Sequence, residues 1–183
     1  FYNVEGINVI ILYPSGKISP IQEKQISTLD KNIYPLEVQG TFDDCQKLVK
    51  RAFLDNQLNS SILLSSANSI NISRLIPQTF YYFYAYSQMN TKEEVVFSVP
   101  SGNFGNLTAG IFSKYMGLPI HKFIASTNSN DVVPKFLKTG NYKPKPSVET
   151  ISNAMDVGNP SNLARILDIY DNIAGIKKDI YSW

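Results

Sequence analysis

The feature that most constrains the fold of this chain is a regular alternation of short strand-like runs with amphipathic helical segments. The β-branched run Ile7–Tyr13 is followed by Ser19-Pro20, which is typical of a helix N-cap with proline at the first helical position. The cycle repeats with the run Ile33–Val38 and a helix that opens at Thr41, where Asp44 completes a capping-box pattern. Such alternation favours a parallel sheet with right-handed crossovers.

The same alternation continues along the chain. Further strands are expected over Ser61–Leu64, Glu94–Val99 and Ile120–Ala125. Further helices are expected from about Ser69 to Met89, from Leu107 to Met116 and from Asp131 to Leu137. Pro77 should kink or restart the first of these helices. We therefore predict an α/β domain over residues 1–145, a three-layer parallel sheet with helices on both faces, and a mostly helical segment without a convincing strand over residues 146–183.

Composition excludes several classes of function. The net charge of +2 is small and the 17 Lys and Arg residues are dispersed, unlike the concentrated basic surface of a nucleic-acid-binding protein. No apolar run approaches the ~20 residues that span a bilayer, and no charged leader precedes an apolar segment. The single Cys45 cannot form an internal disulfide, and the single His121 argues against a metal site. We expect a cytoplasmic protein that binds no nucleic acid, membrane or metal.

The segment Ser101–Asn106 stands where a strand ends and a helix begins, which in an open parallel sheet is the edge that binds ligands. Gly102 and Gly105 allow backbone conformations closed to other residues and let amide N–H groups approach an anion closely. The serine and asparagine side chains of the loop offer more donors, and the positive end of the following helix adds roughly half a unit charge. The pattern predicts a phosphate cradle. An ordinary strand–turn–helix loop, in which Asn106 only caps the helix, fits it equally well.

The run from Ser101 to Gly110, SGNFGNLTAG, closely resembles the phosphate-binding loop of threonine synthases, which belong to the tryptophan-synthase-like family of pyridoxal-phosphate (PLP) enzymes. Other segments resemble the same family in the same order: Leu12–Pro20, Asn68–Gln78, Thr127–Pro134, Ser152–Asp156 and Pro160–Asn162. The resemblance covers nearly all of the chain, which supplies less than half of a typical member. Because the chain also opens at Phe1 without an initiator methionine, we expect a fragment.

The resemblance implies PLP fold type II, with pyridoxal 5'-phosphate as cofactor. In that family the cofactor would be contacted by Gly102, Asn103, Phe104 and Asn106, while Ser101 and Gly105 shape the loop. Asn106 stands where relatives often have aspartate, and an amide beside a phosphate is electrostatically easier than a carboxylate. The lysine that carries the cofactor in the family lies in a Phe-Lys-Asp segment upstream of this chain. No catalytic residue is therefore expected here, and the fragment alone should be inactive.

The resemblance further implies a reaction of threonine biosynthesis, in which O-phospho-L-homoserine and water give L-threonine and phosphate. The remainder of the same polypeptide is then the partner of this chain. Arg74 is the candidate for the substrate phosphate, because a guanidinium can bind a phosphate through two hydrogen bonds. An exposed arginine is, however, commonly only solvated.

Other polar and aromatic residues have structural interpretations. Asn68, Ser69 and Asn71 either line a substrate pocket or cap and brace the helix that follows them, of which bracing is favoured, and Asp131 is expected to cap its helix. The aromatic residues between Phe80 and Tyr86 run all round one helix, which predicts a core or an interface completed by the missing parts. Cys45 is expected in the core, and His121 is assigned no role.

Two other functions fit the sequence. A threonine-synthase-like phospholyase would eliminate phosphate from a related substrate without making threonine, and only product analysis separates the two. A non-catalytic module that holds a phosphorylated metabolite would explain the absent lysine. A Phe-Lys-Asp segment in the upstream coding sequence would establish the enzyme.

Overall fold

The computed structural model describes residues 1–182. The chain forms two compact units, Phe1–Leu64 and Ser65–Trp183, which are described separately. The predicted division at residues 145 and 146 does not coincide with this one, because the segment after 146 adds helices and a strand to the second unit. As a statement about the domains of the complete protein, the division at 145 and 146 stays a prediction.

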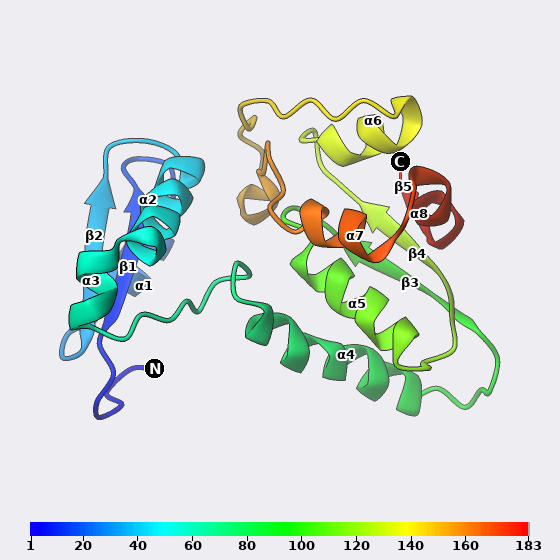
Figure 1. Ribbon diagram of the computed structural model, residues 1–183, viewed down its shortest axis with the longest axis horizontal. Coiled ribbons are helices and arrows are strands. Elements are labelled where there is room, and N and C mark those ends of the chain that lie inside the picture. Colours follow the sequence, from blue (N-terminus) through cyan, green and yellow to red (C-terminus); the bar gives the residue numbers. More distant parts are fainter. Residues whose placement is uncertain (183) are drawn as a thin grey trace. The chain divides into compact units, whose positions relative to one another are not determined.

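The first unit is a two-stranded parallel sheet with three helices (Figure 1). Its elements are β1 (Val9–Pro14), α1 (Pro20–Ser27), β2 (Ile33–Val38), α2 (Phe42–Leu54) and α3 (Asn56–Ser61). Both predicted helix starts are confirmed. Ser19 and Gln22 form a capping box at α1, and Thr41 and Asp44 form one at α2, so each helix begins with its first amides satisfied by neighbours in the sequence.

The strand predicted over Ser61–Leu64 is wrong. Helix α3 ends at Ser61, and the residues after it pair with no strand in the described part of the chain. Leu63 is fully exposed. Three consecutive aliphatic residues resemble a buried strand in sequence, but a strand exists only where a neighbour supplies the hydrogen-bonded ladder.

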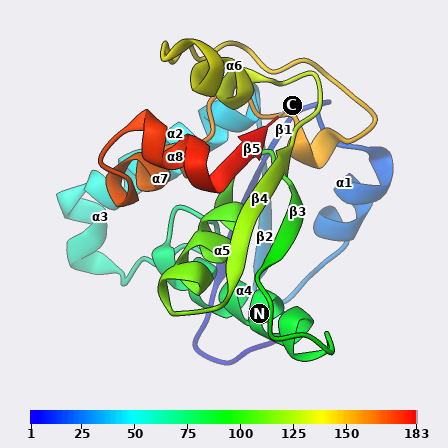
Figure 2. The same ribbon diagram turned by 90° about the vertical axis from the view of Figure 1, so that its right-hand side faces the viewer.

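The second unit contains a three-stranded parallel sheet with the order β3-β4-β5 (Figure 2). Its elements are a short 3-10 turn (Ile72–Arg74), α4 (Leu75–Ser87), β3 (Val95–Pro100), α5 (Gly105–Tyr115), β4 (Ile120–Ser126), α6 (Val132–Thr139), a second 3-10 turn (Asn153–Met155), α7 (Leu163–Ile169), α8 (Ile173–Asp179) and β5 (Ile180–Ser182). The predicted effect of Pro77 is confirmed, since the helix restarts at Leu75 and places Pro77 in its first turn.

The strand β5 corrects the expectation that residues 146–183 contain no strand. Ile180 pairs with Phe123 of β4 in parallel register. A strand of three residues is too short to show the alternation by which strands are recognised, so only its partner reveals it.

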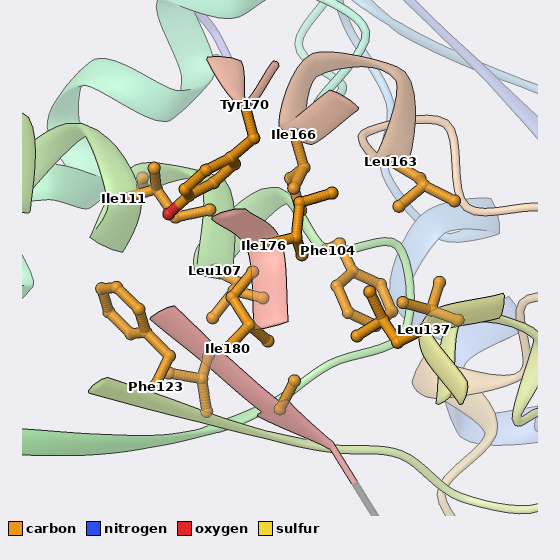
Figure 3. Close-up of a cluster of buried hydrophobic side chains, with 14 of the residues drawn as sticks. Phe104, Leu107, Ile111, Phe123, Leu137, Leu163, Ile166, Tyr170, Ile176 and Ile180 are labelled. Atoms are coloured by element: carbon orange, nitrogen blue, oxygen red, sulfur yellow. The ribbon is translucent and has the colours of Figure 1, made fainter. Parts of the chain in front are cut away.

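The core of the second unit lies between the sheet and its helices (Figure 3). Leu107 and Ile111 of α5 pack there with Phe123 of β4 and Ile176 of α8, and all four are buried. The opposite face of the sheet carries Val96 and Tyr181, which are half exposed. The described residues thus form an α/β structure with small parallel sheets, and helices on both faces stay a prediction for the complete protein.

Gly110 allows α5 to lie against both α4 and the sheet. A Cβ atom at this position would lie 2.7 Å from the ring of Phe123 and 2.7 Å from that of Tyr82. Because both rings are buried, neither has free space to move into. No helix among residues 1–182 is both long and apolar enough to cross a membrane.

Candidate functional site

The glycine loop joins the carboxyl end of β3, at Pro100, to the amino terminus of α5, at Gly105. This confirms the predicted order of strand, loop and helix, although α5 begins two residues earlier than the expected Leu107. Phe104 occupies the N-cap position with a left-handed backbone (φ 61°) and a buried side chain. A left-handed phenylalanine is uncommon, so burial of its ring holds the backbone in this conformation.

The loop turns carbonyl groups toward the protein and leaves amides available. Nδ2 of Asn106 donates to the carbonyl of Pro100 (2.7 Å), and Nδ2 of Asn162 donates to the carbonyl of Asn103 (3.0 Å). Among residues 1–182, the backbone amides of residues 102–106 donate to no acceptor. Consecutive amides that end at a left-handed residue and a helix amino terminus can bind an anion.

The polar side chains of the loop are bonded to the protein itself. The buried hydroxyl of Ser101 donates to the carbonyl of Val99 (2.9 Å), and Nδ2 of Asn103 donates to the hydroxyls of Ser69 (2.9 Å) and Ser161 (2.9 Å). The hydroxyl of Ser101 and Nδ2 of Asn103 thus already donate within the protein and shape the loop. Direct contact of the loop's side chains with a cofactor stays a prediction, and the backbone amides are donors that the loop offers.

The two glycines of the loop are closely packed, and neither adopts a backbone conformation closed to other residues, which corrects the conformational part of the sequence-based reason. Neither has a positive φ. A Cβ at Gly102 would lie 2.7 Å from Cα of Met155. A Cβ at Gly105 would lie 3.3 Å from Cβ of Ser69 and 3.4 Å from Nδ2 of Asn162.

Three side chains from outside the loop, those of Ser69, Asn162 and Arg165, form a clasp behind it. Nδ2 of Asn162 donates to Oγ of Ser69 (3.1 Å), and Oδ1 of Asn162 accepts from a guanidinium nitrogen of Arg165 (2.6 Å). The guanidinium also donates to the carbonyls of Ser69 (3.0 Å) and Ile70 (2.6 Å). The clasp links the segment before the first 3-10 turn, the loop and the start of α7.

Sequence reasoning anticipated only part of the clasp. The expected bracing of the following helix is confirmed for Asn71, whose Oδ1 accepts from the amide of Ser73 (3.0 Å) and whose Nδ2 donates to the carbonyl of Ser66 (3.1 Å). Ser69 instead bonds to the glycine loop and to Asn162. Arg165 was not singled out. The available signal was its spacing of three residues from Asn162 at the start of a predicted helical segment, which places the two side chains on one helix face.

Arg74 is exposed at the end of the first 3-10 turn. Its carbonyl accepts from Nε2 of Gln78 (3.1 Å), while its guanidinium forms no hydrogen bond or ion pair with another described residue. Among the described residues Arg74 forms no hydrogen bond or ion pair with the loop, and its role toward a substrate phosphate stays a prediction.

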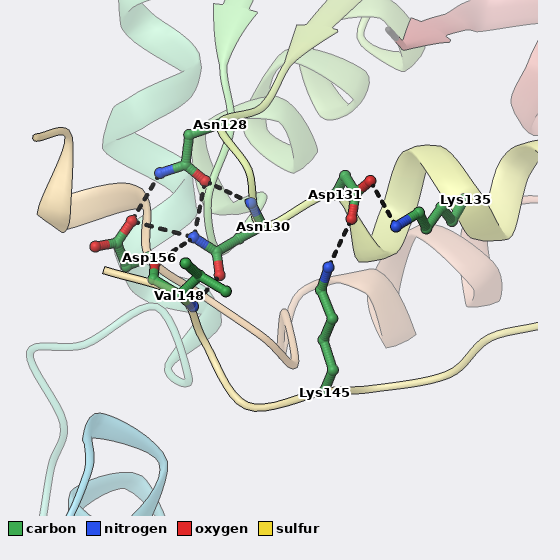
Figure 4. Close-up of polar contacts among 7 residues, drawn as sticks. All are labelled: Asn128, Asn130, Asp131, Lys135, Lys145, Val148 and Asp156. Atoms are coloured by element: carbon green, nitrogen blue, oxygen red, sulfur yellow. Dashed lines mark hydrogen bonds and ion pairs between the residues drawn. The ribbon is translucent and has the colours of Figure 1, made fainter. Parts of the chain in front are cut away.

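A second polar cluster lies at the same sheet edge, because Pro100 at the end of β3 pairs with Ser126 at the end of β4 (Figure 4). Nδ2 of Asn128 donates to Oδ1 of Asp156 (2.8 Å), and Nδ2 of Asn130 donates to the same atom (3.1 Å) and to the carbonyl of Val148 (2.9 Å). These bonds hold the segment that carries Met155, which packs against Gly102.

Asp131 occupies the N-cap position of α6, but its side chain makes no capping hydrogen bond, so the expected capping role is wrong. Its carboxylate instead forms ion pairs with Lys145 (2.7 Å) and Lys135 (2.9 Å), also seen in Figure 4. Hydrogen bonds from Lys145 and then Lys135 lower the pKa of Asp131 to about 2. Two ammonium groups compete better for a carboxylate than a backbone amide does.

Cys45 is buried in the first unit, and burial raises the pKa of its thiol, as expected of a core cysteine. His121 lies exposed on β4, where Nδ1 is 3.1 Å from Oε2 of Glu94.

No protein-family model matches the chain. Among curated proteins, it is 56% identical over 172 residues to the threonine synthase of Haemophilus influenzae, an alignment that covers 93% of this chain and 40% of the relative. It is 48% identical over 174 residues to the threonine synthase of Saccharomyces cerevisiae, which covers 91% of this chain and 34% of the relative. The chain thus spans about two fifths or less of the length of these relatives.

Solved structures are similar over the whole chain. The crystal structure of threonine synthase from Escherichia coli matches with a TM-score of 0.91 and 49% identity, over 100% of this chain and 44% of that one. The PLP-bound threonine synthase of Brucella melitensis matches with a TM-score of 0.80 and 33% identity, over 96% of this chain and 44% of that one.

Proposed function

Since this chain is homologous to a segment of the threonine synthases, we propose that it is the part of such an enzyme that holds the phosphate of pyridoxal 5'-phosphate. The observation that carries the proposal is the run of amides in residues 102–106, which donate to no acceptor in the described part of the chain. In the competing interpretation, Asn106 would be the helix cap. The N-cap position belongs to Phe104, and Nδ2 of Asn106 binds the Pro100 carbonyl. Oδ1 of Asn106 accepts from the amide of Leu107 (2.9 Å), so the side chain satisfies that first-turn amide and leaves the amides of residues 102–106 available.

The loop fits a phosphate in both charge and hydrogen bonding. The amides of residues 102–106 would hold its oxygens, and the amino terminus of α5 would contribute roughly half a unit of positive charge. Each amide bond adds on the order of 1 kcal/mol net, and somewhat more to a charged partner. Ser101 and Asn106 would keep the loop in shape through their bonds to the carbonyls of Val99 and Pro100.

The complete protein is proposed to convert O-phospho-L-homoserine and water to L-threonine and phosphate. When bound, PLP supplies the electron sink for this chemistry. The contribution of this chain is to bind and orient the cofactor through its phosphate. The remainder of the polypeptide would contribute the lysine that carries it. Arg74, whose guanidinium is exposed, is proposed to bind the phosphate of the substrate.

Two further points belong to the same proposal. The complete protein is expected to have a three-layer α/β sheet of PLP fold type II, in which missing elements cover the exposed face that carries Val96 and Tyr181. A reducing cytoplasm is the expected location, which the single free Cys45 supports.

The test is an assay of the complete protein with PLP and O-phosphohomoserine, in which phosphate and threonine are both measured. We expect equal amounts of the two products. Phosphate without threonine would identify a phospholyase, and PLP binding without either product would favour a binding module. Absence of PLP binding would refute the proposal.

A further inference from the structure

The direction of one peptide group decides whether the loop can bind an anion. In a planar trans peptide the carbonyl and the following amide point in opposite directions. The Asn103 carbonyl accepts from Nδ2 of Asn162, so the amide of Phe104 points away from Asn162. If this peptide turned over, the loop would present a carbonyl oxygen in place of a donor, and its partial negative charge would repel a phosphate.

Asn162 is fully buried, and both N–H groups and the oxygen of its side-chain amide form hydrogen bonds within the protein. Its two N–H groups serve Ser69 Oγ (3.1 Å) and the Asn103 carbonyl (3.0 Å), and its oxygen accepts from Arg165 (2.6 Å). An amide so occupied has no donor left for a ligand. Asn162 therefore contributes to the site by holding the loop in position.

Arg165 determines which way the Asn162 amide faces. A guanidinium has donors only, so the oxygen of the Asn162 amide must face it and the nitrogen must face the Asn103 carbonyl. The further bonds of Arg165 to the carbonyls of Ser69 and Ile70 fix the guanidinium itself. In the part of the chain that the structure describes, no carboxylate forms an ion pair with Arg165. Its charge therefore also favours an anion nearby.

We propose that Asn162 is a positioning residue for the PLP phosphate: its amide holds the Asn103 carbonyl turned away from the anion, and Arg165 fixes the orientation of that amide. This inference rests on the proposed function of the loop. The alternative is a purely structural role, in which the clasp only attaches α7 to the segment before the first 3-10 turn. A structural role would make all ligands bind less well when the clasp is changed, whereas a positioning role affects the phosphate alone.

The experiment compares PLP with pyridoxal, which has every group of PLP except the phosphate. Dissociation constants of both are measured by absorption titration of the cofactor-free complete protein, together with its thermal unfolding. In Asn162→Asp the side chain keeps its shape and its bond to Arg165 but loses the donor to the Asn103 carbonyl. We expect PLP to bind about tenfold less tightly or worse, because a donor has become an acceptor beside a carbonyl. Pyridoxal should bind as in the wild type.

A second variant and a matched control complete the design. Arg165→Lys keeps the charge but lacks the rigid planar fork by which the guanidinium reaches its three acceptors, so PLP affinity should fall several-fold with pyridoxal unaffected. If Asn162→Asp does not fold, the Arg165→Lys variant tests the positioning role by itself. Asn172→Asp makes the same chemical change at the N-cap of α8, where an aspartate also caps, and should leave both affinities unchanged.

The outcomes separate this inference from the proposed function. If the wild type binds no PLP, both are wrong. If the wild type binds PLP and the variants bind it equally well, or lose PLP and pyridoxal in proportion, only the positioning role is wrong. A selective loss of PLP in either variant supports it.

Discussion

Replacement of Gly105 by valine tests the cradle most directly. A Cβ at this position lies 3.3 Å from Cβ of Ser69, 3.4 Å from Nδ2 of Asn162 and 3.5 Å from Cδ2 of Leu75, so one carbon already makes tight contacts. The two further methyl groups of valine have to displace the clasp or the loop. Overpacking of this kind costs about 1–3 kcal/mol.

That strain should appear as lost cofactor affinity. The unliganded loop can relieve it by moving away from Ser69 and Asn162, and PLP can bind only if the loop returns. Each 1.4 kcal/mol changes the dissociation constant tenfold, so a strain of about 1–3 kcal/mol should weaken PLP binding by about 5- to 150-fold. Gly105→Ala should lose far less, because it adds only the first carbon and its backbone φ is not positive.

Equilibrium dialysis of PLP against the complete protein measures the effect. His121→Gln is the control, since the His121 side chain is exposed and pairs with Glu94, outside the loop. If Gly105→Val retained as much PLP as His121→Gln, the loop would not be part of the cofactor site.

Three further predictions follow from the packing and charges of the second unit. The low pKa of Asp131 means that its ion pairs stabilise the fold above the unfolded pKa of about 3.9 and lose this effect as pH falls toward about 2, so the stability difference between wild type and Asp131→Asn should shrink between pH 5 and pH 2.5 in urea unfolding. A difference independent of pH would contradict that origin. Gly110→Val should lower the free energy of unfolding by about 1–3 kcal/mol in thermal or urea unfolding, because the buried rings of Phe123 and Tyr82 must move; an unchanged value would show that α4 and α5 can separate freely. The 183-residue chain alone should release no phosphate from O-phosphohomoserine and should lose PLP on gel filtration, since the covalent attachment is expected from the remainder of the polypeptide; a lysine-bound PLP absorption band that survives would show that the lysine lies in this chain.

The candidate site divides into a part that the sequence predicts and a part that it does not. The order of strand, glycine loop and helix could be predicted because all its signals lie between Val95 and Tyr115. The close packing at Gly102 and Gly105 could not be predicted, because the neighbouring residues, Met155, Ser69 and Asn162, lie far away in the sequence. The same distance in sequence hid the bonds of the Asn103 side chain to Ser69 and Ser161, and its contact with the cofactor stays a prediction.

What the sequence determined by itself is local. The capping boxes at Ser19 and Thr41 and the restart of the helix at Pro77 depend on bonds and clashes between residues three or four positions apart, and these form in whatever tertiary structure surrounds them. Only the tertiary structure decided the rest. Ile180 is in a strand because Phe123 offers it a ladder, whereas Leu63 has no such partner in the described part of the chain. The amide of Asn162 bonds to Ser69, 93 residues earlier, and to the carbonyl of Asn103, 59 residues earlier, because the fold brings these segments together. Hydrogen bonds and packing between distant segments depend on where the folded chain brings them together, and no local pattern carries that information.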